Sequence, residues 1–298
     1  MRSHDIFLAL IVAVLWGFNF IVMKVGIEEI HPILFVTIRS IFAFFPLIFF
    51  VKKPPVSWYV IFALGASIGI FKFLFILLGI HFGLCGPMTS LILQSQAFFT
   101  ILFAFFLMAE RPRSYQIFGM LIAFSGVAFV GYDQLCLGTS AGMLCALGAA
   151  ASWGISNVLI KKTANKTPIN MVSLMVWISI IPPIPLFMIT CWMDGFWETI
   201  GTIRQVSLFT YSTLLYSALF SGVAGYALWG YLLQKYPTPL VTPFSMLVPI
   251  VATIFSVLIF HDSFSFNMFI STVLVMTGVL INQFFPYIIK KIRQPNAR

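Results

Sequence analysis

The feature that most constrains this chain is a series of long apolar segments that recurs along its whole length. Each segment holds roughly 18 to 26 residues, and about 20 apolar residues in a helix suffice to cross the hydrocarbon core of a bilayer. Proline or glycine residues lie in most of the breaks between them. The segments are 6–25, 32–51, 58–81, 87–108, 115–132, 140–160, 170–192, 207–232, 239–260 and 264–288. The sequence therefore predicts an all-α polytopic membrane protein with ten transmembrane helices.

Composition excludes a soluble globular domain. Hydrophobic residues make up 60% of the 298 residues and charged residues 8%, with a mean hydropathy of +1.03, whereas charged residues are about 25% of a typical soluble domain. The net charge of +9 does not indicate a nucleic-acid partner, because Lys and Arg cluster at segment ends rather than in a basic stripe with interleaved aromatics. We expect membrane lipid and a small-molecule substrate as partners, no nucleic acid, and a monomer or homodimer.

The basic residues predict an orientation. In the ten-helix scheme, thirteen of the 17 Lys and Arg residues lie on the side of the N-terminus, Lys24 and Arg204 lie on the other side, and Arg39 and Lys72 lie within segments. Cytoplasmic connections carry an excess of Lys and Arg, so both termini are expected in the cytoplasm of a bacterial inner (plasma) membrane. Because no small-residue cleavage site follows the first segment, we expect it to remain as a helix rather than act as a signal peptide.

The two halves of the chain resemble each other. A shift of 152 residues aligns Pro87 with Pro239 and Glu110 with Asp262, and a shift of 137 aligns Trp16 with Trp153. Each half holds five segments, so the second copy enters the membrane from the opposite side, as in transporters built on inverted repeats. We expect a first repeat at 1–137 (helices 1–5), a second at 138–288 (helices 6–10), and a basic cytoplasmic tail at 289–298.

Five polar residues are predicted to form one layer within the membrane: Asn19, Arg39, Lys72, Gln94 and Gln96. Lys72 lies about 14 residues into its segment, roughly 14 Å below the surface. Two interpretations are open. Such residues can snorkel or join helices, or they can form a functional site, because a charge near mid-bilayer costs at least ~2.5 kcal/mol.

The acidic residues favour the second interpretation. All eight Asp and Glu residues lie in connections or at segment ends, so Arg39 and Lys72 lack a carboxylate partner in the membrane. An anionic or zwitterionic ligand could supply that partner, whereas a cation would be repelled. A neutral Lys72 amine is the competing account.

The second half supplies uncharged candidates. Trp153, Asn157, Tyr226 and Ser245 fall within its segments, and Trp16 is the first-half equivalent of Trp153. These aromatics either contact an apolar part of a substrate or pack between helices.

Enzyme chemistry has little support. There is no HExxH or phosphate-loop motif, and the four His residues lie near segment ends. The four cysteines show no metal-ligand spacing. We expect no catalytic residues, no metal and no cofactor.

Several motifs resemble a known family. WGFNFIVMKVG at 16–26 is echoed by WGISNVLIKK at 153–162, and Glu110-Arg111 closes the fourth segment. With ten segments in two repeats, these features resemble the drug/metabolite transporter superfamily, EamA type. The runs LILQSQAFFTILFAFFLMAERP at 91–112 and PFSMLVPIVA at 243–252 are similar to the O-acetylserine and cysteine exporters of that family.

The resemblance implies an inner-membrane transporter that exports small amino-acid metabolites, O-acetylserine- or cysteine-like and zwitterionic or anionic, through a central cavity by alternating access. Two alternatives stay open. One is an importer or exchanger of another metabolite such as S-adenosylmethionine, and the other, of a different class, is a membrane-embedded enzyme.

Overall fold

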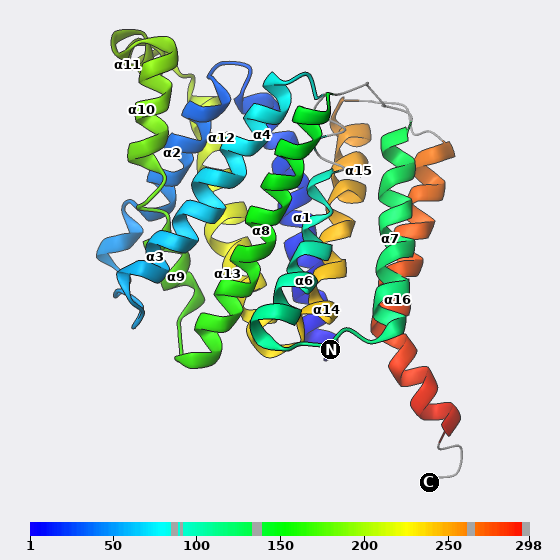
Figure 1. Ribbon diagram of the computed structural model, residues 1–298. Helices are drawn as coiled ribbons and strands as arrows, with labels where there is room; N and C mark the ends of the chain where they lie inside the picture. The colour runs from blue at the N-terminus through cyan, green and yellow to red at the C-terminus, as the bar shows by residue number, and fades with distance from the viewer. Residues whose placement is uncertain (85–88, 90–91, 133–138, 261–265, 294–298) are drawn as a thin grey trace.

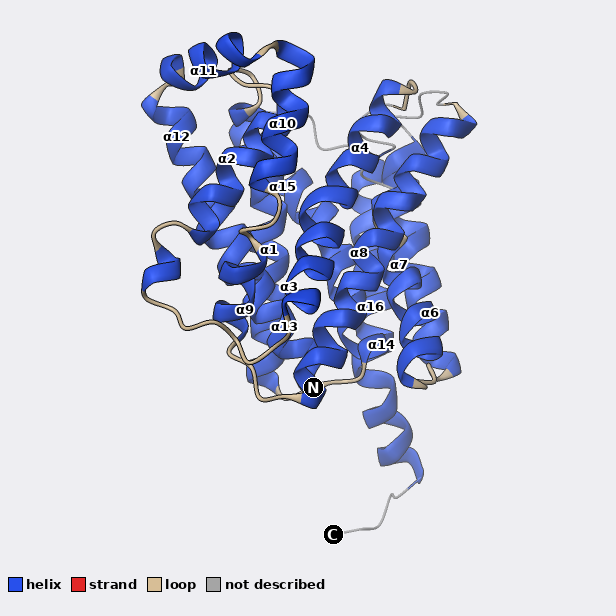
Figure 2. Cartoon of the chain, turned by 60° about the vertical axis from the view of Figure 1, so that its left-hand side comes forward, coloured by secondary structure: helices blue, strands red, loops and turns tan. Residues whose placement is uncertain are grey.

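The computed structural model describes residues 1–84, 89, 92–132, 139–260 and 266–293, and all regular structure there is helical (Figure 2). The helices of the first half are α1 (Ser3–Gly26), α2 (Pro32–Phe44), η1 (Leu47–Phe49), α3 (Trp58–Leu64), η2 (Gly65–Phe71), α4 (Lys72–His81), α6 (Gln96–Met108) and α7 (Ser114–Tyr132). Those of the second half are α8 (Ser140–Lys166), α9 (Met171–Ile178), α10 (Pro183–Asp194), α11 (Phe196–Gln205), α12 (Leu208–Leu215), η3 (Tyr216–Gly225), α13 (Tyr226–Lys235), α14 (Thr238–Val241), η4 (Thr242–Leu247), α15 (Val248–Phe260) and α16 (Phe266–Arg293).

An all-helical, multi-pass membrane protein is confirmed. Within the described residues, six helical stretches are long and apolar enough to cross a membrane, and the bent pair Phe196–Gln205 and Leu208–Lys235 makes a seventh if it counts as one span. The six are Ser3–Gly26, Pro32–Phe49, Trp58–His81, Ser140–Lys166, Met171–Asp194 and Thr238–Phe260. Each of the ten predicted segments overlaps at least one helix.

Several of these stretches are not uniform α-helices. η2 and η3 are π-helical and interrupt the runs that end in α4 and α13, while η4 is a 3-10 helix before α15. α9 and α10 are separated at Ser179–Pro182, where a run of prolines prevents a continuous helix. π-helical turns are rare and occur frequently at functional sites.

The helices form one bundle in which the halves of the chain interleave (Figure 1). α8 packs against α4 and α6, and α1 packs against α15 and η3. α7 and α16 lie side by side at one flank, where a Cβ on Gly119 would come within 2.7 Å of the Gly278 carbonyl oxygen. Small residues therefore allow these two backbones to touch, a common device between membrane helices.

The two ends of the bundle differ. α1 begins and α16 ends at the same end of the bundle, and α11 lies across the opposite end (Figures 1 and 2). Large apolar side chains remain exposed on the periphery, among them Trp192 at 85% and Leu208 at 86%. A soluble monomer rarely exposes wide apolar patches, whereas a lipid-facing surface requires them.

Candidate functional site

A cavity of about 270 Å³ lies between helices of both halves. Its inner wall includes Arg39 of α2, Lys72 of α4 and Tyr226 of α13. It extends to Ile27 and Ile80, which lie at the ends of α1 and α4 that are far from the N-terminus. The cavity therefore reaches from the middle of the bundle toward the end opposite the N-terminus.

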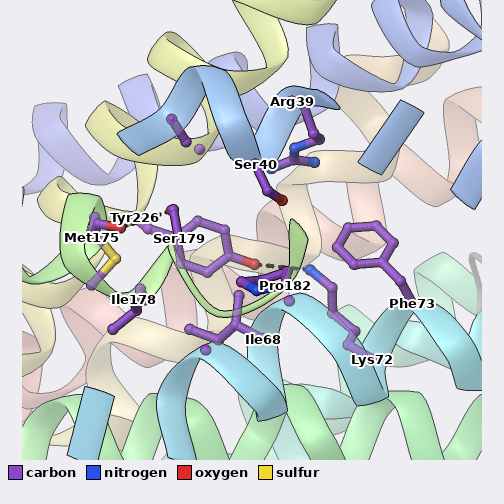
Figure 3. A pocket seen from close by; sticks show the side chains of 14 residues that line it. Arg39, Ser40, Ile68, Lys72, Phe73, Met175, Ile178, Ser179, Pro182 and Tyr226 are labelled. Carbon is purple, nitrogen blue, oxygen red and sulfur yellow. Dashed lines mark hydrogen bonds between the residues drawn. The ribbon is translucent and has the colours of Figure 1, made fainter. Parts of the chain in front are cut away.

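Lys72 is held at this cavity by a tyrosine and by aromatic rings. It is the first residue after the π-helical η2, is buried, and its Nζ donates a 3.1 Å hydrogen bond to the hydroxyl of Tyr226 (Figure 3). The same Nζ lies 4.4 Å from the ring centre of Phe73, 5.1 Å from that of Trp153 and 5.6 Å from that of Tyr226. Aromatic faces attract cations, so this setting compensates part of the cost of burying the amine.

Arg39 shares the same environment but has fewer partners. Its guanidinium carbon lies 5.6 Å from the ring centre of Phe73, and its side chain points toward the Lys72–Tyr226 pair (Figure 3). A Cβ at Gly222 would lie 3.4 Å from Arg39 Nη2, so glycine there leaves room for the guanidinium. Among the described residues, neither Arg39 nor Lys72 forms an ion pair with a carboxylate, and Arg39 has no hydrogen-bond partner.

A second, smaller cavity of about 50 Å³ adjoins this pair. Arg39, Lys72 and Tyr226 line it together with Ser179 and Pro182, at the break between α9 and α10 (Figure 3). One water occupies about 30 Å³ in the liquid, so this space holds one or two waters rather than a metabolite. The larger cavity is the candidate for a ligand.

Three buried polar atoms of the larger cavity's lining residues lack a hydrogen-bond partner in the described part of the chain. They are Asn19 Oδ1, Gln94 Oε1 and Trp153 Nε1. Buried polar groups are nearly always satisfied, and each exception calls for an explanation such as a missing ligand or water.

The remaining polar candidates form a separate network. Gln96 Nε2 donates to Ser245 Oγ at 2.7 Å, and Asn157 Nδ2 donates to Gln96 Oε1 at 3.0 Å and to Thr100 Oγ1 at 3.1 Å. Trp229 Nε1 completes it by donating to Asn157 Oδ1 at 3.0 Å. None of these five residues lines the cavity. The structure thus places Gln94 at the cavity and Gln96 in a buried junction of α6, α8, η4 and α13.

Trp16 connects the two regions. Its Nε1 donates to the Ser221 carbonyl oxygen at 3.1 Å, and its ring centre lies 5.6 Å from that of Trp153, 4.9 Å from that of Tyr226 and 5.3 Å from that of Trp229. It lines the cavity beside Trp153 and Tyr226. Aromatic pairs at such separations stabilise each other in tilted or edge-on arrangements. The cluster therefore stabilises the wall of the cavity.

Ion pairs hold the halves of the chain together at the N-terminal end. Lys161 Nζ lies 2.5 Å from Glu110 Oε1 and donates to the Tyr236 carbonyl oxygen at 2.7 Å, and the Thr238 N–H donates to Glu110 Oε2 at 2.9 Å. At α1, Asp5 accepts a 2.6 Å hydrogen bond from the Tyr236 hydroxyl. Burial, followed by that bond, raises the pKa of Tyr236 above its ordinary value of 10.0.

Sequence reasoning missed some members of both regions. Phe73 touches both cations but is one of 34 phenylalanines, and nothing in the sequence distinguishes it. Thr100 had a usable signal, because it follows Gln96 by four residues and so shares its helix face. Glu110 was noted as the end of a segment, yet its pairing with Lys161 follows from the fold alone.

The chain is similar along most of its length to a known family of membrane proteins. Residues 5–132 and 140–283 match the EamA-like transporter family. The chain belongs to that family. This EamA-like chain is therefore a membrane transporter and not an enzyme.

Two curated relatives share most of their length with this EamA-like transporter. A "Probable amino-acid metabolite efflux pump" of Escherichia coli (strain K12) is 36% identical over 287 residues, which cover 95% of this chain and 96% of the relative. The protein of the same name from Salmonella typhimurium (strain LT2) is 34% identical over 290 residues, again 95% and 96%. A solved crystal structure superposes with a TM-score of 0.78 at 14% identity, covering 97% of this chain and 100% of the other. At that identity it supports the fold alone.

Proposed function

We propose that this transporter exports small amino-acid metabolites, O-acetylserine- or cysteine-like, across the bacterial plasma membrane by alternating access. The observation that carries the proposal is a cavity with two cations, Arg39 and Lys72, that no described carboxylate neutralises. The names of the two relatives support the direction of transport and the class of substrate.

Arg39 and Lys72 are suited to hold a substrate carboxylate. A guanidinium can bind both carboxylate oxygens at once, and an ammonium adds a charge-assisted hydrogen bond. Tyr226 holds the Lys72 amine in place, and Phe73 lies against both cations. A carboxylate would replace the missing counter-charge.

The arrangement of the cavity supports alternating access. The cavity extends away from the N-terminus, while the pairs Lys161–Glu110 and Lys235–Asp5 join the two halves of the chain at the N-terminal end. With both termini in the cytoplasm, as we propose, this arrangement corresponds to the outward-facing state of the transport cycle. Opening to the cytoplasm then requires those two pairs to separate.

Ten transmembrane helices in two inverted repeats, 1–137 and 138–288, with a tail at 289–298, are part of the proposal. Trp16 and Trp153, which a shift of 137 aligns, touch each other in the bundle. The shift of 152 places 65–71, the whole of π-helical η2, on 217–223, inside π-helical η3. Equivalent irregularities in both halves support a common origin.

Transport in proteoliposomes tests the proposal. Labelled cysteine or O-acetylserine is loaded, and its release is compared with that of its methyl ester, which lacks the carboxylate charge. We expect the wild type to prefer the acid and Arg39→Gln and Lys72→Gln to lose that preference by several-fold or more, since a charge-assisted bond contributes ~1.5 to 3 kcal/mol.

Lys24→Gln is the matched control, because Lys24 is exposed and lies outside the cavity, over the ring of Phe260. It should transport as the wild type does. Normal preference for the acid in well-expressed Arg39→Gln and Lys72→Gln proteins would overturn the carboxylate assignment. Uptake without release would instead establish an importer.

A further inference from the structure

An amino acid brings an ammonium group as well as a carboxylate. Two cations account for the carboxylate, but the described cavity lining contains no acidic side chain to receive the ammonium. Two residues of the lining each carry a buried oxygen atom without a donor, Asn19 Oδ1 and Gln94 Oε1. The residues are 7% and 2% exposed, so bulk water does not satisfy these oxygens.

We propose that Asn19 and Gln94 form an ammonium subsite, and that the cavity takes amino acids with an unsubstituted α-amino group and an uncharged, apolar side chain. The inference rests on the proposed function for the carboxylate end of the ligand. It adds how the α-amino group and the side chain of the amino acid are recognised.

In this cavity, neutral amide oxygens suit a substrate ammonium better than the carboxylate of an acidic side chain would. An Asp or Glu in place of Asn19 or Gln94 would compete with the substrate carboxylate for Arg39 and Lys72, because opposite charges attract strongly where water is scarce. A neutral oxygen accepts an N–H bond and leaves those cations free. The two residues come from α1 and from the turn before α6, so the ammonium would bridge separate segments.

Trp153 supplies a third unsatisfied group of the opposite kind. Its Nε1 is a buried donor without an acceptor, and its ring lies against Lys72. An indole N–H can only donate, so it fits the carboxylate rather than the ammonium. The residues that line this cavity thus carry one unsatisfied donor as well as two unsatisfied acceptors, and a zwitterion requires both kinds of partner.

The rest of the cavity determines the side chain. Beyond Arg39 and Lys72 the lining has no charged residue in the described part of the chain, and most of its members are apolar, among them Met23, Ile76 and Ile80. A charged side chain would lose its hydration there without a partner. At about 270 Å³ the space is small by the standard of ligand pockets, about 300 to 1,000 Å³.

Binding to the purified full-length protein tests the inference, with leucine, N-acetylleucine and lysine as probes. Leucine and N-acetylleucine share the carboxylate and the side chain and differ at the amino group. We expect leucine to bind the wild type about tenfold or more tightly than N-acetylleucine, the effect of one charge-assisted bond. Lysine should bind at least as weakly as N-acetylleucine.

Asn19→Leu and Gln94→Leu should reduce the preference for leucine over N-acetylleucine to about twofold or less. Both should stay folded, because replacing an unsatisfied buried amide by an apolar side chain is nearly neutral or stabilising. Asn282→Leu and Gln283→Leu are controls: each also removes an amide with an unpartnered oxygen, but away from this cavity, where the amide nitrogens donate to the Gln116 and Leu240 carbonyl oxygens. Both controls should retain the preference.

The outcomes separate the two proposals. Equal binding of leucine and N-acetylleucine, both dependent on Arg39, would overturn the ammonium subsite and leave the carboxylate site standing. Retained preference in folded Asn19→Leu and Gln94→Leu proteins would also overturn it. If Arg39→Gln and Lys72→Gln bound leucine and N-acetylleucine as tightly as the wild type does, the proposed function itself would be overturned.

Discussion

Lys72 Nζ donates a hydrogen bond of 3.1 Å to the hydroxyl of Tyr226, and each of the two residues is the first after a π-helical segment. They are 154 positions apart and belong to different halves of the chain. The two π-helices thus deliver one cation and one hydroxyl to the same point of the cavity.

Tyr226→Phe keeps the ring and removes the hydroxyl that accepts this bond. We expect it to lower the free energy of unfolding in detergent by about 1 to 3 kcal/mol, since it leaves a buried ammonium without a hydrogen-bond acceptor. Lys72→Met combined with Tyr226→Phe should recover most of that loss, which a double-mutant cycle measures. Additive effects of the two changes would contradict the pairing.

Gln94 and Gln96 should respond in opposite ways to the same substitution. Gln96→Leu breaks bonds to Ser245 and Asn157, so we expect a loss of about 1 to 3 kcal/mol in stability with little change in substrate affinity. Gln94→Leu should retain stability and lose affinity. Thermal unfolding and binding measured on both proteins check this, and the reverse pattern would show that the two roles are exchanged.

The ion pair between Lys161 and Glu110 is expected to hold the N-terminal end closed. Lys161→Met leaves Glu110 without its cation, and breaking a buried pair from one side costs up to about 3 kcal/mol. Lys162→Met, one residue along the same helix, is the control and should be close to neutral. If Lys161→Met and Lys162→Met unfolded at the same temperature, the Lys161–Glu110 pair would not hold the N-terminal end closed.

Topology can be tested by cysteine labelling in a background without the native cysteines. Cysteines at Lys53 and Thr167 should react with an impermeant reagent only in inverted vesicles, and those at Glu28 and Trp197 only in intact cells. The reason is the excess of basic residues on the side of the membrane that carries Lys53 and Thr167. Labelling of Lys53→Cys from outside would reverse the orientation and with it the outward-facing assignment.

A pH-dependent contact joins the connection after α1 to the start of α12. Glu29 Oε2 accepts from the Ser207 N–H at 2.9 Å and Glu29 Oε1 from its hydroxyl at 2.7 Å, and these bonds lower the pKa of Glu29 from 4.5. A lowered pKa in the folded state means that the contact stabilises above pH 4.5 and is lost as pH falls through the lowered value. Hydrogen exchange at Ser207, corrected for intrinsic rates, should show this loss of protection, and Glu29→Gln should abolish the pH dependence.

Hydropathy predicted the helical segments but not how each one is built. The ten apolar runs all overlap helices because a bilayer forces apolar backbone into helix. The π turns within two of these runs leave no trace in hydropathy, since α and π turns accept the same apolar residues. The amphipathic helix α11 was missed because it has only 10 residues, too few for an apolar span.

For the site, the sequence indicated depth but not direction. Depth alone placed Arg39, Lys72, Gln94 and Gln96 in one layer. The structure divides that layer, because rotation about each helix axis determines which residues meet the cavity, and rotation depends on turns and breaks such as the one before Gln96. Likewise, the absence of acidic residues raised the question of what surrounds Lys72, whereas Tyr226 and the three rings follow from tertiary packing.

The π-helical segments also set the direction in which Lys72 and Tyr226 point around their helix axes. A π turn carries more residues than an α turn, so η2 sets the direction in which every later residue of its span points. If the same seven residues Gly65–Phe71 formed ordinary α turns instead, they would turn the chain through a larger angle, and Lys72 would point in a different direction around the helix axis. The span would keep its hydropathy and still cross the membrane, yet its amine would face away from Tyr226. The number of residues per turn in η2 therefore decides whether Lys72 faces Tyr226 and the cavity.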